Sequence, residues 1–248
     1  MGSLRKNLCS VAQMEWKHRL TLLHSIASDL QIIHSQGLIH RDLHSCNILQ
    51  DDLKSAYITD LGLAISTNKA PEEKGNGIYG ILPFIAPEVL NGGHYTTASD
   101  IYSFGIILWE ILYGKTVSFN DALKQQLMTD ICLNDLRPTI IEDSPQCYIS
   151  LMKKCWDKKP MNRPSAIEIC EIFTQWQSDE NILLELRKSN EVLKNIENIH
   201  IHSYSHCIYK DKNTNSDDNL KSSYIGYTAS CYQDTNLNEL YELEIGDL

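Results

Sequence analysis

Residues 101–114, which read IYSFGIILWEILYG, form the most apolar stretch of this 248-residue sequence. The stretch is too short to span a bilayer, and it carries an acidic residue, Glu110. A helix that is apolar on nearly every side has to lie in the middle of a sizeable core, because none of its faces suits contact with water. The sequence therefore predicts a globular domain built around one buried helix.

Helical spacing continues on both sides of this stretch. Over residues 14–36 apolar side chains recur with the period of a helix, and Gly37 follows as a stop signal. A last helix is predicted to start where Ser165 and Glu168 form an S-x-x-E capping box. Two further helices are predicted, at residues 121–132 and 146–158. The predicted fold class is mainly α with a small β portion (α+β), a helical bundle around a buried central helix.

Three short apolar pieces, LIH, NIL and AYIT, lie between the first helix and the buried one, separated by polar stretches. Their lengths, and the Asp-Asp turn between two of them, predict small strands joined by polar loops. Residues 62–94 are rich in Gly, Pro and Asn, and they are predicted to form a long loop that is ordered or functional.

The acidic composition restricts the classes of partner. The formal net charge is −10, from 32 acidic and 22 basic residues, and such a surface repels nucleic acid and anionic membranes at long range. We therefore expect neither a nucleic-acid partner nor a membrane partner. The eight cysteines form no C-x-x-C pair and no secretory signal opens the sequence, which favours reduced thiols in a cytoplasmic protein.

Two polar motifs lie among the predicted strands. LIHRDLHSCNIL spans residues 38–49, and YITDLGLA spans residues 57–64. APE follows at 86–88, and the segments SDIYSFGIILWEIL and LMKKCWDKKPMNRPS come later in the chain. In this order and at this spacing, the motifs over roughly residues 3–176 resemble the protein kinase catalytic domain, nearest to its tyrosine-kinase-like group. The resemblance implies the fold of the large, C-terminal kinase lobe, with short strands beside the catalytic loop.

The resemblance assigns the chemistry of phosphoryl transfer to the first two motifs. Asp42, which stands in the HRD triplet with His40 and Arg41, would accept the proton of the substrate hydroxyl and orient the attacking oxygen. Asn47 and Asp60 would be oxygen ligands of Mg²⁺ bound to the phosphates of ATP. His40 itself is expected to be a packed structural histidine rather than a base.

Arg41 is expected to bind a phosphate on the segment 62–86. The candidate acceptors of that phosphate are Ser66, Thr67 and Tyr79, which the sequence does not rank. Phosphorylation would order the segment, because a phosphate group pairs with arginine side chains.

Other motif residues would support the site. Gly62 would give the backbone the freedom to turn Asp60 inward. Glu88 and Arg163 would form a buried ion pair that fixes the end of the loop to the helical body. Asp100, at the start of the buried helix, would accept hydrogen bonds from the backbone of the catalytic loop.

The sequence departs from a full kinase domain upstream of the catalytic motif. A full domain carries a glycine-rich loop, a phosphate-binding lysine and its glutamate partner there, in a separate small lobe. Only 41 residues precede Asp42, and they contain neither the loop nor a V-A-x-K lysine. GNGIYG, residues 75–80, fits G-x-G-x-x-G but follows no strand and opens no helix, so we interpret it as part of the activation segment. We expect a large lobe without its small lobe.

Three features bear on the type of hydroxyl that is phosphorylated. Serine/threonine kinases usually carry lysine where this chain has His44 and threonine where it has Ile81, and the catalytic-loop arginine of tyrosine kinases is also missing. The group resemblance favours serine or threonine of a protein substrate. His44 is expected to be an exposed loop residue, and nothing near Cys46 predicts a reactive thiol.

Composition divides the chain into three parts. Residues 1–176 form the predicted kinase lobe, 177–200 an amphipathic helix, and 201–248 a largely disordered, acidic and asparagine-rich tail. The apolar stripe over 182–196 could recruit a partner or a second copy, or pack back onto the lobe. The tail also offers potential metal ligands, for which an ordinary polar loop is the alternative: His200, His202, His206 and Cys207.

Three functions are open on these grounds. The intact Asp42, Asn47 and Asp60 favour an ATP- and Mg²⁺-dependent protein kinase. The missing small-lobe residues favour a truncated pseudokinase that serves as a non-catalytic binding or regulatory module, because water in a half-open nucleotide pocket weakens electrostatic contacts. The third possibility is that the sequence is a fragment of a longer kinase.

Overall fold

A computed structural model describes residues 2–52, 55–67, 78–117, 124–195 and 225–226 of the chain. For residues 189–195 and 225–226 it describes the backbone alone. Among the residues described, no helix combines the length and the apolar character needed to cross a bilayer. The predicted metal ligands of the tail, residues 200–207, lie outside the described ranges, as do residues 75–77 of the GNGIYG motif.

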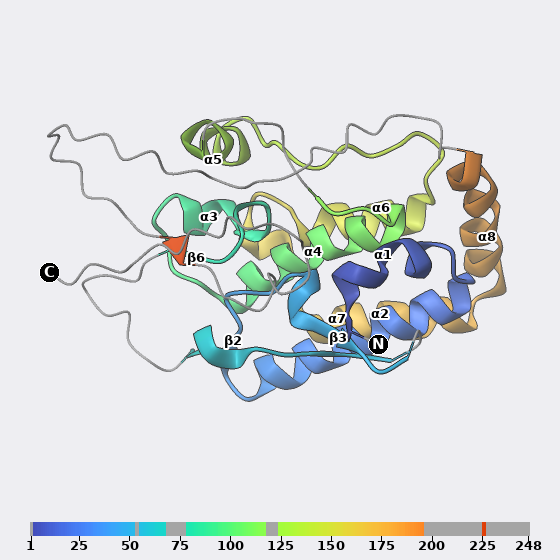
Figure 1. Ribbon diagram of the computed structural model, residues 1–248, viewed down its shortest axis with the longest axis horizontal. Coiled ribbons are helices and arrows are strands. Elements are labelled where there is room, and N and C mark those ends of the chain that lie inside the picture. Colours follow the sequence, from blue (N-terminus) through green and yellow to red (C-terminus); the bar gives the residue numbers. More distant parts are fainter. Residues whose placement is uncertain (1, 53–54, 68–77, 118–123, 196–224, 227–248) are drawn as a thin grey trace, which may run out of the picture.

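Helix α4, Thr97–Tyr113, lies at the centre of the fold (Figure 1). All residues from Ser99 to Leu112 are buried, which confirms that the apolar stretch is the central core helix. Ser99 Oγ accepts the backbone N–H of Thr96 (3.0 Å) at the start of the helix. The helix ends at Gly114, whose left-handed backbone conformation (φ 66°) is one that glycine adopts without strain.

The other helices pack around α4 (Figure 1). Within the described ranges they are α1 (Leu4–Ala12), α2 (Trp16–Ser35), α3 (Pro87–Leu90), α5 (Lys124–Cys132), α6 (Gln146–Cys155), α7 (Ala166–Ser178) and α8 (Glu180–Asn195). Helices α1 and α6 pack directly on α4, and α2 packs along α7. Helix α8 packs against α7 and α2, with Leu183 and Leu186 buried. The described part of the tail helix therefore uses its apolar stripe within the chain.

The start of the chain differs from the prediction. The sequence pattern predicts one helix over residues 14–36, whereas the chain forms α1 first and begins α2 at Trp16. Leu4, Leu8 and Val11 recur at about one helical turn and are all buried. The prediction missed α1 because a helix of little more than two turns carries too few apolar positions for its period to stand out.

The β portion consists of short strands. The first sheet is antiparallel and has the strand order β1-β3-β4; its strands are β1 (Gly2–Ser3), β3 (Ile48–Gln50) and β4 (Ala56–Ile58). In the second, β2 (Leu38–Ile39) pairs antiparallel with β5 (Ile65–Ser66). In the third, β6 (Ile78–Tyr79) pairs parallel with β7 (Ile225–Gly226). The three apolar pieces predicted as strands are β2, β3 and β4. Ile48 and Ile58 form the last pair of the β3–β4 ladder. Asn47 directly precedes Ile48 and Thr59 directly follows Ile58, so these two residues come together at one end of the sheet.

Single-turn 3₁₀ helices shape the connections between these elements. They are η1 (Ser45–Asn47), η2 (Leu61–Leu63), η3 (Leu82–Phe84) and η4 (Pro160–Asn162). The predicted capping box of α7 is confirmed, since Ser165 N donates to Glu168 Oε2 (2.7 Å) and Glu168 N to Ser165 Oγ (3.3 Å). The cysteines described are free thiols.

Glu110 is the acidic residue of the central helix, and it is fully buried. Its Oε1 accepts the backbone N–H of Val117 (2.9 Å), so the side chain closes the turn that follows α4. Burial raises the pKa of the carboxyl to about 7, because the charged form is deprived of water. The folded protein therefore holds a proton on Glu110 at pH values where the unfolded chain has lost it.

This shift predicts a pH dependence of stability. The proton on Glu110 stabilises the folded state fully below the ordinary pKa of 4.5, and that contribution is lost as pH rises to about 7. Relative to Glu110→Gln, the wild-type free energy of unfolding should fall by roughly 3 kcal/mol over this range. Urea denaturation of both proteins at several pH values measures the difference. Parallel pH profiles would contradict the assignment.

Candidate active site

The loop from His40 to Asn47 connects β2 to β3 and rests on the first turn of α4. Asp100, which is buried there, accepts the backbone N–H of His40 on Oδ2 (2.8 Å) and that of Arg41 on Oδ1 (3.0 Å). His34 of α2 adds a contact from Nε2 to Asp100 Oδ2 (2.9 Å). One carboxylate thus joins the loop, the central helix and α2.

His40 is fully buried and makes structural hydrogen bonds at both ring nitrogens. Its Nδ1 accepts the backbone N–H of Asp42 (3.3 Å), and its Nε2 lies 3.0 Å from the carbonyl oxygen of Thr59. Because Nδ1 accepts, Nε2 carries the proton and donates to Thr59. The imidazole therefore links the loop to the strand end that precedes Asp60.

Asp42 is buried (3% exposed), and its neighbours in the loop hold it. Asn47 Nδ2 donates to the main-chain oxygen of Asp42 (2.9 Å) and to its Oδ2 (3.1 Å). The other carboxylate oxygen, Oδ1, lies 3.3 Å from His44 Nε2. Both oxygens of the carboxylate consequently have a partner from the same loop.

The prediction that His44 is exposed is wrong, since its side chain is only 2% exposed. The ring packs edge-on against Phe84, with 6.0 Å between ring centroids, and Nδ1 accepts the N–H of Cys46 (3.2 Å). Burial lowers the pKa of His44, but the side-chain contacts with the Asp42 carboxylate and the Cys46 thiol outweigh burial and raise that pKa to about 9. The sequence pattern could not show this contact, because the two-residue spacing from Asp42 is compatible with either direction of the side chain.

Asp60 follows β4 and lies at the same end of the sheet as Asn47. Thr59 bridges them, since its N and its Oγ1 both donate to the carbonyl oxygen of Asn47 (2.8 and 3.1 Å). Asp60 has a left-handed backbone (φ 62°), and its Oδ1 accepts the N–H of Gly62 (3.3 Å). A Cβ on Gly62 would lie 3.1 Å from that oxygen, so glycine allows the close turn. An amide oxygen and a carboxylate are oxygen ligands that suit Mg²⁺.

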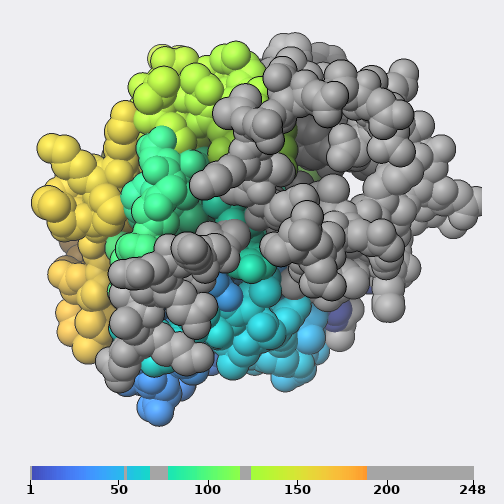
Figure 2. Space-filling model, turned by 90° about the vertical axis from the view of Figure 1, so that its left-hand side faces the viewer, coloured from blue at the N-terminus to red at the C-terminus, as the bar shows by residue number. Residues whose placement is uncertain are grey.

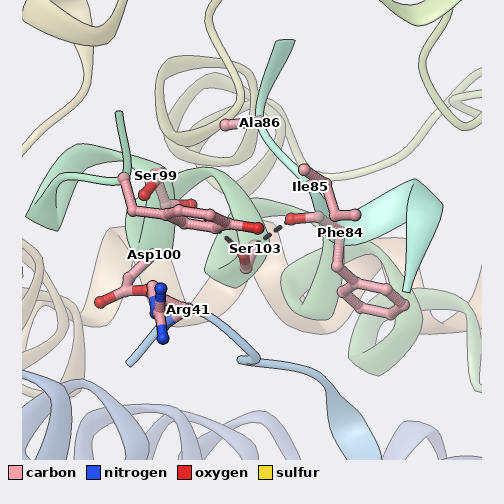
Figure 3. A pocket seen from close by; sticks show the side chains of 8 residues that line it. Arg41, Phe84, Ile85, Ala86, Ser99, Asp100 and Ser103 are labelled. Atoms are coloured by element: carbon pink, nitrogen blue, oxygen red, sulfur yellow. Dashed lines mark hydrogen bonds between the residues drawn. The ribbon is translucent and has the colours of Figure 1, made fainter. Parts of the chain in front are cut away.

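Arg41 extends from the loop toward the segment that precedes APE. Its Nε donates to the carbonyl oxygen of Leu63 (2.5 Å). Its Cζ lies 4.9 Å from the ring centroid of Tyr79 and 5.5 Å from that of Tyr95, within the range of cation–π contacts. Figure 3 shows Arg41 beside Asp100 in a small pocket that Phe84 and Ile85 also line.

The three candidate phosphorylation sites lie in different surroundings. Ser66 is in β5, and the exposed Thr67 follows it and donates its N–H to Gly37 O (2.7 Å). Tyr79 is in β6, and of the three its side chain is the one against Arg41. In Figure 2 the cyan surface of residues 55–67 adjoins the green surface of residues 78–95 on one face of the molecule.

Glu88 of α3 and Arg163 form a two-pronged ion pair, with Nη1–Oε1 and Nη2–Oε2 distances of 2.7 Å. The arginine side chain is fully buried, and the glutamate side chain is 21% exposed. Arg163 also donates to the carbonyl oxygens of Ala98 (2.9 Å) and Asp157 (2.8 Å). The pair thus fixes the end of the APE segment to the start of α4 and to the turn before α7.

A family model described as protein tyrosine and serine/threonine kinase matches residues 1–173. The chain belongs to the protein kinase family. The kinase fold here is mostly helical with small sheets, as the resemblance of the motifs implies.

Several curated kinases are similar to this one. A probable LIM domain-containing serine/threonine-protein kinase of Dictyostelium discoideum is 34% identical over 188 residues, which cover 75% of this chain and 28% of that protein. A putative serine/threonine-protein kinase/receptor of Acanthamoeba polyphaga mimivirus is 36% identical over 173 residues, 68% of this chain and 10% of its own length. A serine/threonine/tyrosine-protein kinase of Arabidopsis thaliana is 31% identical over 157 residues, which cover 63% of this chain and 40% of that protein. The chain spans less than half the length of these relatives.

Three residues that contact the candidate site are absent from the site residues predicted from the sequence: His34, His44 and Tyr95. His34 contacts Asp100, His44 contacts Asp42, and Tyr95 contacts Arg41. Each contacts a residue that the motifs do identify. A search for polar or aromatic residues just outside the motifs would have found His34 and Tyr95 as candidates, but not their partners.

The Glu88–Arg163 pair predicts a large difference between two isosteric substitutions. Glu88→Gln removes the charge that faces a buried guanidinium and should lower the free energy of unfolding by about 3 kcal/mol. Asp135→Asn breaks the ion pair of Asp135 with Arg137 (2.9 Å). Because the side chain of Asp135 is 62% exposed, this substitution should lower the free energy of unfolding by less than about 1 kcal/mol. Chemical denaturation at neutral pH compares them, and equal costs would contradict a structural role for the buried pair.

Proposed function

We propose that this chain is the catalytic lobe of an ATP-dependent protein kinase that phosphorylates serine or threonine of a protein substrate. The main support is the environment of Asp42, whose two carboxylate oxygens face His44 Nε2 (3.3 Å) and Asn47 Nδ2 (3.1 Å). A carboxylate held on both oxygens keeps one orientation. Phosphoryl transfer depends chiefly on positioning and on charge neutralisation, so this is the property that the reaction requires.

In this proposal Asp42 accepts the proton of the substrate hydroxyl as the hydroxyl oxygen attacks the γ-phosphate. Asn47 keeps Asp42 in place through both its main-chain and its carboxylate oxygen. Asp100 holds the backbone of the preceding residues, so the orientation of Asp42 is set from the core outward.

Asn47 and Asp60 are the proposed ligands of Mg²⁺ bound to ATP. Thr59 bonds to Asn47 O and directly precedes Asp60, which keeps the two residues at one end of the sheet. Among the described residues, no three His, Cys, Asp or Glu side chains gather into a complete metal cluster. Two protein ligands suit Mg²⁺, which usually keeps waters and substrate phosphates in its coordination shell. The bound ion would neutralise charge on the transferred phosphate.

Serine or threonine is the proposed target for two reasons. The similar kinases of Dictyostelium and mimivirus bear the name serine/threonine kinase. The catalytic loop, HRDLHSCN, also lacks the arginine that tyrosine kinases carry there. Residues 1–176 are the proposed kinase lobe, and 177–200 are proposed as an amphipathic helix, whose described part packs on that lobe.

The second candidate function is a non-catalytic binding module. The observation that favours it is that Leu61, directly after Asp60, is 49% exposed, so the described part of the chain leaves this side of the site partly open to water. A site open on this side would leave bound phosphates in contact with water, which weakens every charge–charge contact.

Transfer of labelled phosphate from MgATP to a generic protein substrate tests the catalytic proposal. Asp42→Asn should lower the rate at least about 100-fold, because it removes the proton acceptor. Asp51→Asn, the same change at an exposed turn residue in the same part of the chain, should leave the rate unchanged. Folded wild-type protein that transfers no phosphate would contradict catalysis by this chain.

Thermal stabilisation by nucleotide separates the two functions further. A ligand that binds only the folded state raises the melting temperature in proportion to the logarithm of its concentration. If Asp60 holds the metal, stabilisation by ATP should require Mg²⁺ in the wild type and lose that requirement in Asp60→Asn. No stabilisation at millimolar MgATP would favour a module that does not bind nucleotide.

A further inference from the structure

The hydroxyl of Tyr95 bonds to both backbone groups of a single residue, Tyr79. It accepts the N–H of Tyr79 (2.8 Å) and donates to the carbonyl oxygen of Tyr79 (2.6 Å). Tyr95 lies between α3 and α4, and Tyr79 lies in β6, before the APE motif. One side chain just before the central helix therefore bonds both the N–H and the carbonyl oxygen of Tyr79.

The residue after Tyr79 lies against the catalytic loop. Gly80 has a backbone φ of +106°, and a Cβ there would approach Arg41 O and Asp42 Oδ1, both at 3.4 Å. The main chain at Gly80 thus sits next to the carboxylate of Asp42. A displacement of Tyr79 would change this contact, because the two residues are adjacent in the chain.

The ring of Tyr95 contributes a second contact on the same side. Arg41 lies against the rings of both Tyr79 and Tyr95, and its Nε donates to a neutral carbonyl group, that of Leu63. Within the described part of the chain, no carboxylate forms an ion pair with Arg41. The side chain expected to bind a phosphate on this segment is thus already held by two tyrosines.

We propose that Tyr95 is a positioning residue that holds the segment at Tyr79 and Gly80 against the catalytic loop in the unphosphorylated chain. The proposal rests on the proposed kinase function for its catalytic meaning, but the holding contact itself is independent of turnover. Burial raises the pKa of Tyr95 to about 12, so the hydroxyl keeps the proton that it donates.

Amide hydrogen exchange, followed by NMR on the full chain, tests the contact. Mass spectrometry first establishes that the chain carries no phosphate. Tyr95→Phe keeps the ring and removes the hydroxyl, and the amide of Tyr79 should then exchange at least about fivefold faster. Tyr113→Phe is the matched control, because the hydroxyl of Tyr113 also accepts a backbone N–H, that of Ile141 (3.1 Å), at a distance from the site.

The Nε–H resonance of Arg41 distinguishes positioning from general stability. It should move in Tyr95→Phe, because release of Tyr79 displaces the Tyr79 ring that lies against Arg41, and it should keep its chemical shift in the control Tyr113→Phe. Equal exchange of the Tyr79 amide in the wild type and Tyr95→Phe would overturn the proposal. Protection of that amide that appears only after phosphorylation of the segment would overturn it as well.

Kinetics add a readout in the active enzyme. Tyr95→Phe should lower kcat for a protein substrate roughly fivefold and leave KM for ATP unchanged, because the segment lies beside Asp42. An unchanged kcat would overturn the positioning role. If neither the wild type nor any variant transfers phosphate, the proposed kinase function is contradicted. The proposal that Tyr95 holds the segment is then still decided by the hydrogen-exchange result.

Discussion

The bonding of the Asp100 carboxylate is the interaction on which the rest of the site depends. The Asp100 side chain lies at the start of the buried helix α4, and its carboxylate accepts two consecutive backbone N–H groups, those of His40 and Arg41. Hydrogen bonds to a buried charge are among the stronger ones in proteins, because the low dielectric surroundings screen them little. Through them the buried central helix sets the path of the loop that carries Asp42.

Two residues of the site adopt backbone conformations that are unfavourable for side chains other than glycine. Arg41 (φ 70°) and Asp60 (φ 62°) both have left-handed geometry. Each such residue costs on the order of 1–3 kcal/mol, and the surrounding bonds have to offset that cost. Asp100 bonds to the N–H of Arg41, and the carboxylate of Asp60 accepts the N–H of Gly62. The strain and its compensation therefore occur at the residues proposed to act in catalysis.

Much of this arrangement could be predicted from the sequence, where the signal is local or carried by the motifs. The central helix followed from its unbroken apolar character, and the α7 cap followed from the spacing of Ser165 and Glu168. Contacts between segments far apart in the chain gave no such signal. The burial of His44 depends on Phe84, and the role of Tyr95 depends on where β6 lies, so both require the tertiary fold. Helix α1 was missed for a different reason, its shortness.

The central claim is that the core helix orients the catalytic loop through Asp100. Hydrogen exchange at the amides of His40 and Arg41 in Asp100→Asn tests it most directly. Loss of the charged acceptor should speed exchange of at least one of these amides by about tenfold or more, while the amides of α4 keep their wild-type protection. Unchanged exchange at both amides in a folded variant would contradict the claim that this carboxylate holds the loop.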